Sequence, residues 1–276
     1  MSRRPGRITG LMSTSHILRT ELRWDSLGFD PLIDHYRVHG IPGARSFEPS
    51  PDNLLGSTVY PRWVHTGLDP EGHSWSYQIV PVSAAGLVGP RGRGLVARAK
   101  PSVTATGTEL VRVGSFDART LEFQYAPAAY ASIPKTYPGA VFEHTSGEAI
   151  GSTWPYLLPG PGDAWAGNKV YRQRWTFELD ALTDDPQLAI WLVDTTTLVS
   201  TLSIKINSTL LPELPLPIGA TKGSRSGDAN TNPLLVRSFH EFGVDRSLFT
   251  AGENTIEFSV PTGGWVAWDA IGLYAP

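Results

Sequence analysis

The sequence predicts an all-β protein built from two antiparallel β-sandwiches in tandem. Short segments alternate apolar and polar residues with the period of a strand, and no segment shows the period of a long amphipathic helix. The 276 residues include 28 glycines and 23 prolines, which implies many turns between short strands. Hydrophobic residues make up 41% of the chain, so each sandwich can bury a core. We expect one domain over residues 1–104 and a larger one over residues 105–276.

The first domain contains three segments that alternate clearly. These are residues 21–24, 35–39 and 75–82. Clusters of Gly, Pro, Asp and Asn lie between them and predict turns. Strands and turns at this spacing are typical of a small sandwich of about 100 residues.

The second domain follows a small, polar stretch, residues 101–115, which we interpret as a linker or a first edge strand. Its clearest strand is residues 201–206, where Leu202, Ile204 and Ile206 share one face. The full set of expected strands is residues 120–125, 170–179, 187–193, 201–206, 232–239, 254–260 and 265–274. The loops between them are longer than in the first domain, so we expect a larger sandwich.

Composition excludes several classes of protein. The chain has no cysteine, which rules out disulfides, cysteine-bound zinc and a thiol nucleophile. The net charge of −3 divides into +4 for residues 1–104 (12 basic, 8 acidic) and −7 for residues 105–276 (11 basic, 18 acidic). Neither part has the basic run typical of nucleic-acid binding, and no stretch is apolar enough to span a membrane. We therefore predict neither nucleic acid nor membrane as a partner.

The first domain contains Trp24, Tyr36, Leu68 and the segment 75–86, in that order. This order and spacing resemble those of a fibronectin type III domain. The resemblance covers roughly residues 5–100. It implies a sandwich that is typically a spacer in carbohydrate-active enzymes, but this fold hosts many functions and so assigns none.

The second domain has its own set of aromatic and turn motifs from Phe116 onward. They are Trp154, Pro155, Tyr156 and the segments 159–167, 175–179, 191–194, 202–207, 248–256 and 263–273. In this order they resemble the C-terminal, carbohydrate-binding-module-like domain of rhamnogalacturonan lyases (polysaccharide lyase family 4). The resemblance implies a jelly-roll-like sandwich, an extracellular or cell-surface location, and recognition of an acidic or rhamnose-containing polysaccharide. The N-terminus has no apolar run of the kind a signal peptide needs, so the protein is cytosolic, leaves the cell by another route, or is part of a longer chain.

Lyase activity is not carried over from this resemblance. In that family a catalytic sandwich precedes the two domains that match here, and it has no counterpart in this chain, so we name no catalytic residue. β-Elimination needs a base near C5 of a uronate and a cation for its carboxylate. Side chains of these types are present without forming a motif: His144, Lys169, Tyr171, Arg172, Arg174 and His240.

Three interpretations of function follow. The first is a non-catalytic pair of carbohydrate-recognition modules associated with degradation of rhamnogalacturonan or pectin-type polysaccharides. The second is the C-terminal portion of a polysaccharide lyase whose catalysis lies elsewhere. The third is a structural or adhesion component of a surface or tail assembly.

The candidate sugar site is the stretch 151–167, which combines Trp154, Tyr156 and Trp165 with four glycines and three prolines. Proline fixes φ and glycine permits unusual φ, so we expect a stiff loop that presents aromatic rings to the apolar faces of sugars. Trp265 is a fourth predicted platform. The alternative is that the rings plug one end of the sandwich. The polar contacts are assigned to Asp163, Asn168, Lys169 and Arg174.

A structural Ca²⁺ is the one cofactor that the resemblance raises. Modules of this kind often bind Ca²⁺ through carboxylates of the first and last strands and through loop carbonyls. Glu122 and Asp269 lie on those predicted strands. Asp269 shares a face with Ile271 and Leu273, so it begins on the buried side, where a carboxylate needs a metal, an arginine or a backbone N–H as partner.

Overall fold

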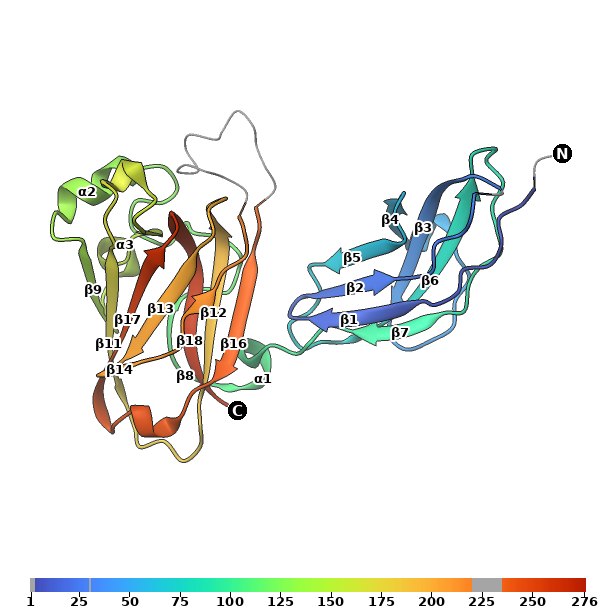
Figure 1. Ribbon diagram of the computed structural model, residues 1–276. Helices are drawn as coiled ribbons and strands as arrows, with labels where there is room; N and C mark the ends of the chain where they lie inside the picture. The colour runs from blue at the N-terminus through green and yellow to red at the C-terminus, as the bar shows by residue number, and fades with distance from the viewer. Residues whose placement is uncertain (1–2, 30, 220–234) are drawn as a thin grey trace. The chain divides into compact units, whose positions relative to one another are not determined.

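The computed structural model describes residues 3–29, 31–219 and 235–276 (Figure 1). The chain divides into two compact units, Met1–Thr106 and Gly107–Pro276, two residues from the boundary predicted by the sequence. The predicted all-β class is confirmed, because the described part of each unit consists of paired strands with only short helices. No helix among the described residues is long and apolar enough to cross a membrane.

Unit 1 is a sandwich of a three-stranded and a four-stranded sheet, with the order β1-β2-β5 in one and β4-β3-β6-β7 in the other. The strands are β1 (Met12–His16), β2 (Arg19–Arg23), β3 (Ile33–Pro42), β4 (Leu54–Thr58), β5 (Arg62–Thr66), β6 (Ser74–Ser83) and β7 (Leu95–Arg98). Trp24 and Tyr36 are buried between the sheets, with their rings in an edge contact at 5.4 Å. Both belong to the pattern that carries the fibronectin type III resemblance.

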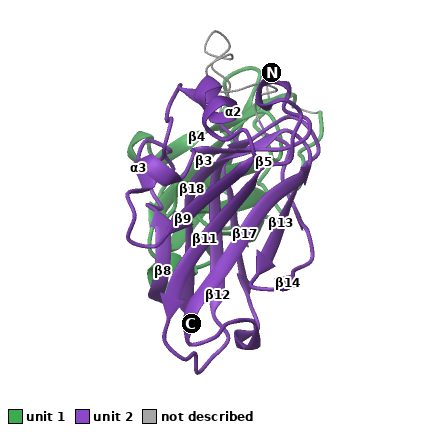
Figure 2. Cartoon of the chain, turned by 90° about the vertical axis from the view of Figure 1, so that its left-hand side faces the viewer, with its two compact units in different colours: residues 1–106 green, residues 107–276 purple. Residues whose placement is uncertain are grey.

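Unit 2 is a larger sandwich of two sheets. One has the order β10-β18-β12-β16, with β8 also paired to β18, and the other has the order β14-β13-β17-β11-β9, with β15 also paired to β13. Its strands are β8 (Thr108–Gly114), β9 (Val141–Thr145), β10 (Leu157–Pro159), β11 (Arg172–Leu179), β12 (Gln187–Thr195), β13 (Thr201–Ile206), β14 (Thr209–Leu210), β15 (Leu214–Pro215), β16 (Ser238–Gly243), β17 (Gly252–Thr262) and β18 (Trp265–Ala275). Figure 2 shows β9, β11, β17 and β13 side by side. All pairs are antiparallel except β9 with β11.

The helices are single turns that lie between strands. The α-helices are α1 (Val103–Thr106), α2 (Ile133–Thr136) and α3 (Ile150–Thr153), and the 3-10 turns are η1 (Pro51–Asn53), η2 (Tyr130–Ser132), η3 (Ala164–Ala166) and η4 (Arg246–Leu248). The predicted linker 101–115 therefore contains α1 and the edge strand β8.

The centre of unit 2 is β18. Its residues from Trp265 to Tyr274 are all buried, and β12 pairs along one edge while β10 and β8 pair successively along the other. A strand buried on both faces favours apolar residues at successive positions, and between Trp265 and Tyr274 Asp269 is the one charged residue.

Two strand predictions need correction. Residues 120–125 form a turn-rich loop, not a strand, and Tyr125 has a positive φ of 66°. The edge of β18 is taken by β8, which lies in the stretch 101–115 predicted as a linker or a first edge strand, and by β10, which was not predicted. The segment 120–125 instead makes an isolated bridge from Gln124 to Pro155. The expected strand 232–239 falls partly outside the described residues, and β16 begins at Ser238.

Candidate functional site

The loop after β10 is held rigidly at the end of unit 2. The backbone N–H groups of Gly160 and Gly162 donate to the carbonyls of Gly264 and Gly263, the second at 2.7 Å. A Cβ on either Gly160 or Gly162 would lie 2.9 Å from the Gly263 carbonyl oxygen, so only glycine permits this approach. The Pro-Gly-Pro-Gly composition thus serves a close contact between two backbones.

Asp163 fixes the turn that follows. One carboxylate oxygen accepts hydrogen bonds from the backbone N–H of Trp165 (3.0 Å) and Ala166 (3.3 Å) and so caps η3. The other accepts from the Tyr130 hydroxyl. Burial raises the pKa of Asp163 and the three hydrogen bonds oppose that rise. Asp163 was predicted to contact sugar, but it is buried and fully engaged, so its role is to build the loop.

Trp165 is the exposed aromatic side chain that this loop presents. It is 68% exposed, although tryptophan is usually largely buried. Val199 (71% exposed) and Leu198 (41%) are exposed apolar side chains on the loop after β12. A Cβ on Gly162 would lie 2.7 Å from Leu198 Cδ1, which places this loop beside the one that carries Trp165. Sequence reasoning did not find Leu198 and Val199, because they are distant in sequence from the stretch 151–167.

The other three predicted platforms are core residues, so their predicted role in stacking on sugar is wrong. Trp154, Tyr156 and Trp265 are fully buried and present no face to a ligand. The Trp154 ring makes edge contacts with Trp175 at 6.3 Å and Trp268 at 5.9 Å, between the two sheets. For these rings the alternative interpretation, packing inside the sandwich, is the one that the structure supports.

The remaining polar residues divide between the loop and the sheet. Asn168 and Lys169 follow Trp165 on the same loop; the Asn168 amide donates to the Pro161 carbonyl at 2.9 Å, and Lys169 Nζ lies 3.4 Å from the Pro138 carbonyl oxygen. Arg174 lies on β11, where it pairs with Glu143 at 3.1 Å and Glu257 at 3.2 Å. Two carboxylates already neutralise Arg174, so it is not a free cation for a sugar acid.

A second candidate site is the acidic cluster around Asp269 on β18. This side chain is 1% exposed, and one oxygen accepts from the backbone N–H of Arg119 at 3.1 Å. The other oxygen has no hydrogen-bond partner among the described residues. Burial, aided by the carboxylates of Asp117 and Glu122 and opposed by two backbone hydrogen bonds, raises the pKa of Asp269 to about 7.

Asp269 offers a hard cation an unpartnered oxygen. Ca²⁺ prefers carboxylate and carbonyl oxygens and would satisfy this atom. Asp269, Asp117 and Glu122 do not form a group of three side chains whose ligand atoms converge; among the described residues such a group is found on the surface of unit 1, at Asp69, Glu71 and His73. Glu122, the predicted partner ligand, raises the pKa of Asp269, but it comes from the loop after β8, where its Oε1 accepts from the Ser115 N–H at 2.9 Å. Asp117, from the same loop, was not predicted as part of this site. The sequence feature that could have indicated it is its position shortly before Glu122.

The candidate bases do not assemble into an acid–base site. His144 lies on β9 and bonds to Thr153 Oγ1 at 2.8 Å, while His240 lies on β16 in the opposite sheet. Burial lowers the pKa of both imidazoles, that of His240 to about 4. The Tyr171 hydroxyl donates to the Ala166 carbonyl at 3.4 Å. These side chains therefore lie in different parts of the sandwich and do not meet at one site.

Comparisons with known proteins concern part of the chain. No protein-family model and no curated protein matches the sequence. Similar solved structures include the fourth fibronectin type III domain of a human protein (18% identity, 37% of this chain, 84% of that chain, TM-score 0.31). The fibronectin type III domain of human fibronectin type III domain containing protein 3 is similar over 38% of this chain and 95% of its own (10% identity, TM-score 0.32).

A third similar structure is the spore cortex lytic enzyme SleM of Clostridium perfringens (17% identity, 34% of this chain, 28% of that chain, TM-score 0.27). The strand order of unit 1, with sheets of three and four strands, is the reason for describing this unit as fibronectin type III-like. The resemblance of unit 2 to a lyase module stays a prediction.

Proposed function

We propose that unit 2 is a non-catalytic carbohydrate-recognition module that binds polysaccharide through Trp165. The observation that supports this most strongly is the 68% exposure of this ring on a loop fixed at both ends by backbone hydrogen bonds. A flat ring suits the apolar face of a pyranose. Because the loop is held in place beforehand, binding costs little ordering of the protein.

The neighbouring groups favour a pectin-type ligand with both neutral and acidic sugars. A rhamnose ring would stack on Trp165, and the Lys169 ammonium, four residues along the loop, would take a uronate carboxylate. Residues 105–276 carry a net charge of −7, which repels an acidic polymer at long range. Salt screens such repulsion, so affinity for rhamnogalacturonan should rise when ionic strength increases from about 0.01 M to 0.15 M.

The test is calorimetry or affinity electrophoresis of the full chain with rhamnogalacturonan, polygalacturonate and a neutral glucan. Trp165→Ala should abolish binding, whereas Tyr60→Ala removes a comparably exposed ring (62%) from unit 1 and should leave it unchanged. Equal affinity of wild type and Trp165→Ala would overturn the proposal. If sedimentation shows that Trp165→Ala changes self-association of the protein and not sugar binding, the loop is an assembly contact.

In this proposal the fibronectin type III-like unit is a spacer, and the pair serves degradation that is catalysed by another domain or protein. The chain alone should then release no unsaturated uronate from rhamnogalacturonan, as followed by ultraviolet absorbance. Steady release that survives purification would instead support a lyase.

A further inference from the structure

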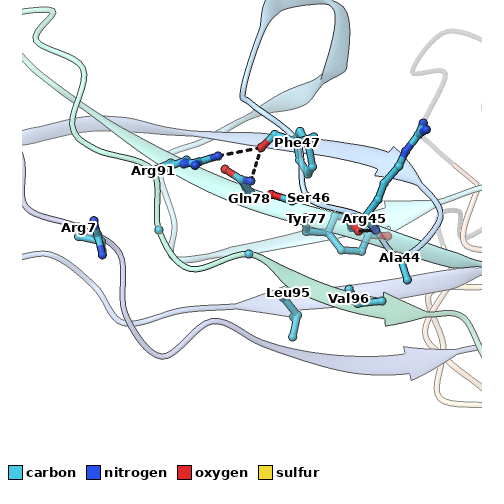
Figure 3. Close-up of a pocket in the computed structure, with 13 residues that line it drawn as sticks. Arg7, Ala44, Arg45, Ser46, Phe47, Tyr77, Gln78, Arg91, Leu95 and Val96 are labelled. Carbon is cyan, nitrogen blue, oxygen red and sulfur yellow. Dashed lines mark hydrogen bonds between the residues drawn. The ribbon is translucent and has the colours of Figure 1, made fainter.

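Unit 1 contains a hollow of about 540 Å³ on its four-stranded sheet (Figure 3). It lies between β6, the segment 44–47 that follows β3, and the segment 91–96 that leads into β7. This size is within the range of small-molecule sites in proteins. The hollow belongs to unit 1 alone and is separate from the Trp165 loop.

The hollow is open in part because Gly94, on its wall, has no side chain. Gly92 and Gly94 alternate with Arg91 and Arg93 in the segment before β7. A Cβ on Gly94 would lie 3.7 Å from Cγ and 3.9 Å from Nε2 of Gln78, which is ordinary contact. A longer side chain at position 94 would therefore extend over Gln78 and fill the space.

The floor is polar and held in place. Gln78 is 5% exposed, and its Nε2 donates to the Phe47 carbonyl at 2.6 Å. Ser76 Oγ donates to the Gly43 carbonyl at 2.8 Å and accepts from the Arg45 N–H at 2.9 Å. The Gln78 Oε1 accepts no hydrogen bond within the described part of the chain. A buried acceptor without a donor is costly, so a ligand that donates to it gains affinity.

The wall and rim are cationic. Arg7, Arg45 and Arg91 line the hollow, and no acidic residue does. Arg91 donates to the Phe47 carbonyl at 3.0 Å and pairs with Glu48 at 2.5 Å, but the Glu48 side chain is 77% exposed and lies outside the lining. Figure 3 shows Arg91 directed at Phe47, with Arg7 on the same side of the view as Arg91 and Arg45 extended on the opposite side. Because three arginines line the hollow and Glu48 lies outside it, the hollow favours an anion that competes with Glu48 for Arg91.

We propose that this hollow binds a carboxylate that carries a neighbouring hydroxyl group. The carboxylate would pair with the Arg91 guanidinium, and the hydroxyl would donate to Gln78 Oε1. Two sources offer this chemistry: a uronate residue of a polysaccharide and a free hydroxy acid. The proposal is independent of sugar binding at Trp165, so Trp165→Ala should leave it intact.

The test is titration of the ¹⁵N-labelled full chain, followed by NMR, with sodium citrate, trigalacturonate or inorganic phosphate. We expect saturable shifts of the Gln78 side-chain amide and of the Gly92 and Gly94 amides with the hydroxycarboxylates. Shifts with trigalacturonate alone identify a saccharide as the source, and shifts with citrate alone identify a free acid. No saturable shift with either, or equally tight binding of phosphate, overturns the proposal. Tighter binding of a single-stranded oligonucleotide would also overturn it.

Three variants separate binding from folding. Arg91→Gln should weaken affinity about tenfold, as loss of a charge-assisted hydrogen bond does. Glu48→Gln should strengthen affinity, because it frees Arg91, and a purely structural arginine would show no such gain. Gly94→Leu fills the hollow and should abolish the shifts. Arg19→Gln removes an exposed arginine on β2 and is the matched control. Unchanged affinity in Arg91→Gln and Gly94→Leu would contradict the proposal.

Discussion

The Tyr130 hydroxyl donates a hydrogen bond to the Asp163 carboxylate, whose other oxygen caps the turn that carries Trp165. Tyr130→Phe would leave a buried carboxylate oxygen without this donor. Such a loss costs about 1–3 kcal/mol, so the free energy of unfolding in urea should fall by that amount. Tyr60→Phe removes an exposed hydroxyl and is the control. Equal stability of Tyr130→Phe and wild type would show that the bond does not hold the loop.

Truncation of two tryptophans in the stretch 151–167 should change the stability of the protein by very different amounts. Trp154→Ala removes a fully buried ring and should cost about 3–5 kcal/mol of unfolding free energy. Trp165→Ala removes an exposed ring and should change the unfolding free energy by no more than about 0.5 kcal/mol. Thermal or urea unfolding of both variants checks this. A large loss of stability in Trp165→Ala would mean that the ring serves packing, and its proposed role in binding would lose its main support.

The sequence could predict this loop but not which of its rings faces solvent. Glycine and proline mark irregular backbone wherever the chain folds. Trp154 and Tyr156 are buried because of long-range pairing. The backbone N–H of Trp268 on β18 donates to the Tyr156 carbonyl at 3.0 Å, and β10, which follows Tyr156, pairs with the edge of β18. Trp165 stays outside because Asp163 starts a separate turn. Neither contact can be read from the local pattern.

Strands with one covered face were the most predictable part of the fold. Residues 201–206 alternate cleanly and form β13 with those bounds. The segment 120–125 alternates as well, yet it forms a turn-rich loop, which contacts the chain before β10 through an isolated bridge from Gln124 to Pro155. Asp269 was predicted to be buried from its parity with Ile271, but β18 is buried on both faces, so parity was not the cause.

The acidic cluster around Asp269 predicts stabilisation by Ca²⁺. Without a cation, the pKa of Asp269 is about 7 in the folded state and has its ordinary value of 3.8 in the unfolded state. Between these two pH values the folded state holds a proton that the unfolded state has released. This group therefore contributes less stability as pH rises from about 4 to about 7. A metal ligand must be deprotonated, so the gain from Ca²⁺ should be largest above pH 7. At about 100 times the Kd the gain is about 2.7 kcal/mol.

Calorimetry at pH 8 with Ca²⁺ or with a chelator measures this gain. Asp269→Asn should lose the response to Ca²⁺ and should be no less stable than wild type in chelator, because a buried charge has been removed. Asp180→Asn removes an exposed carboxylate of the same unit and should keep the response. A Tm that is the same with Ca²⁺ and with chelator would rule out a calcium site here.

His240 on β16 predicts a loss of stability in acid. Burial lowers the pKa of its imidazole from 6.5 to about 4, so the folded state binds this proton less readily than the unfolded state does. The stability linked to His240 is therefore fully present above about pH 6.5 and is lost as pH falls towards 4. At about 1.4 kcal/mol for each pKa unit the loss is at most about 3.5 kcal/mol.

The sign of this effect is opposite to that of Asp269 over the same pH range, so the two must be separated. Asp269 contributes equally to wild type and to His240→Gln, and its contribution cancels in their difference. The unfolding free energy of wild type minus that of His240→Gln should therefore fall between pH 6.5 and pH 4 and be constant above pH 7. A difference that does not change with pH would mean that His240 is as well solvated in the folded chain as in the unfolded one.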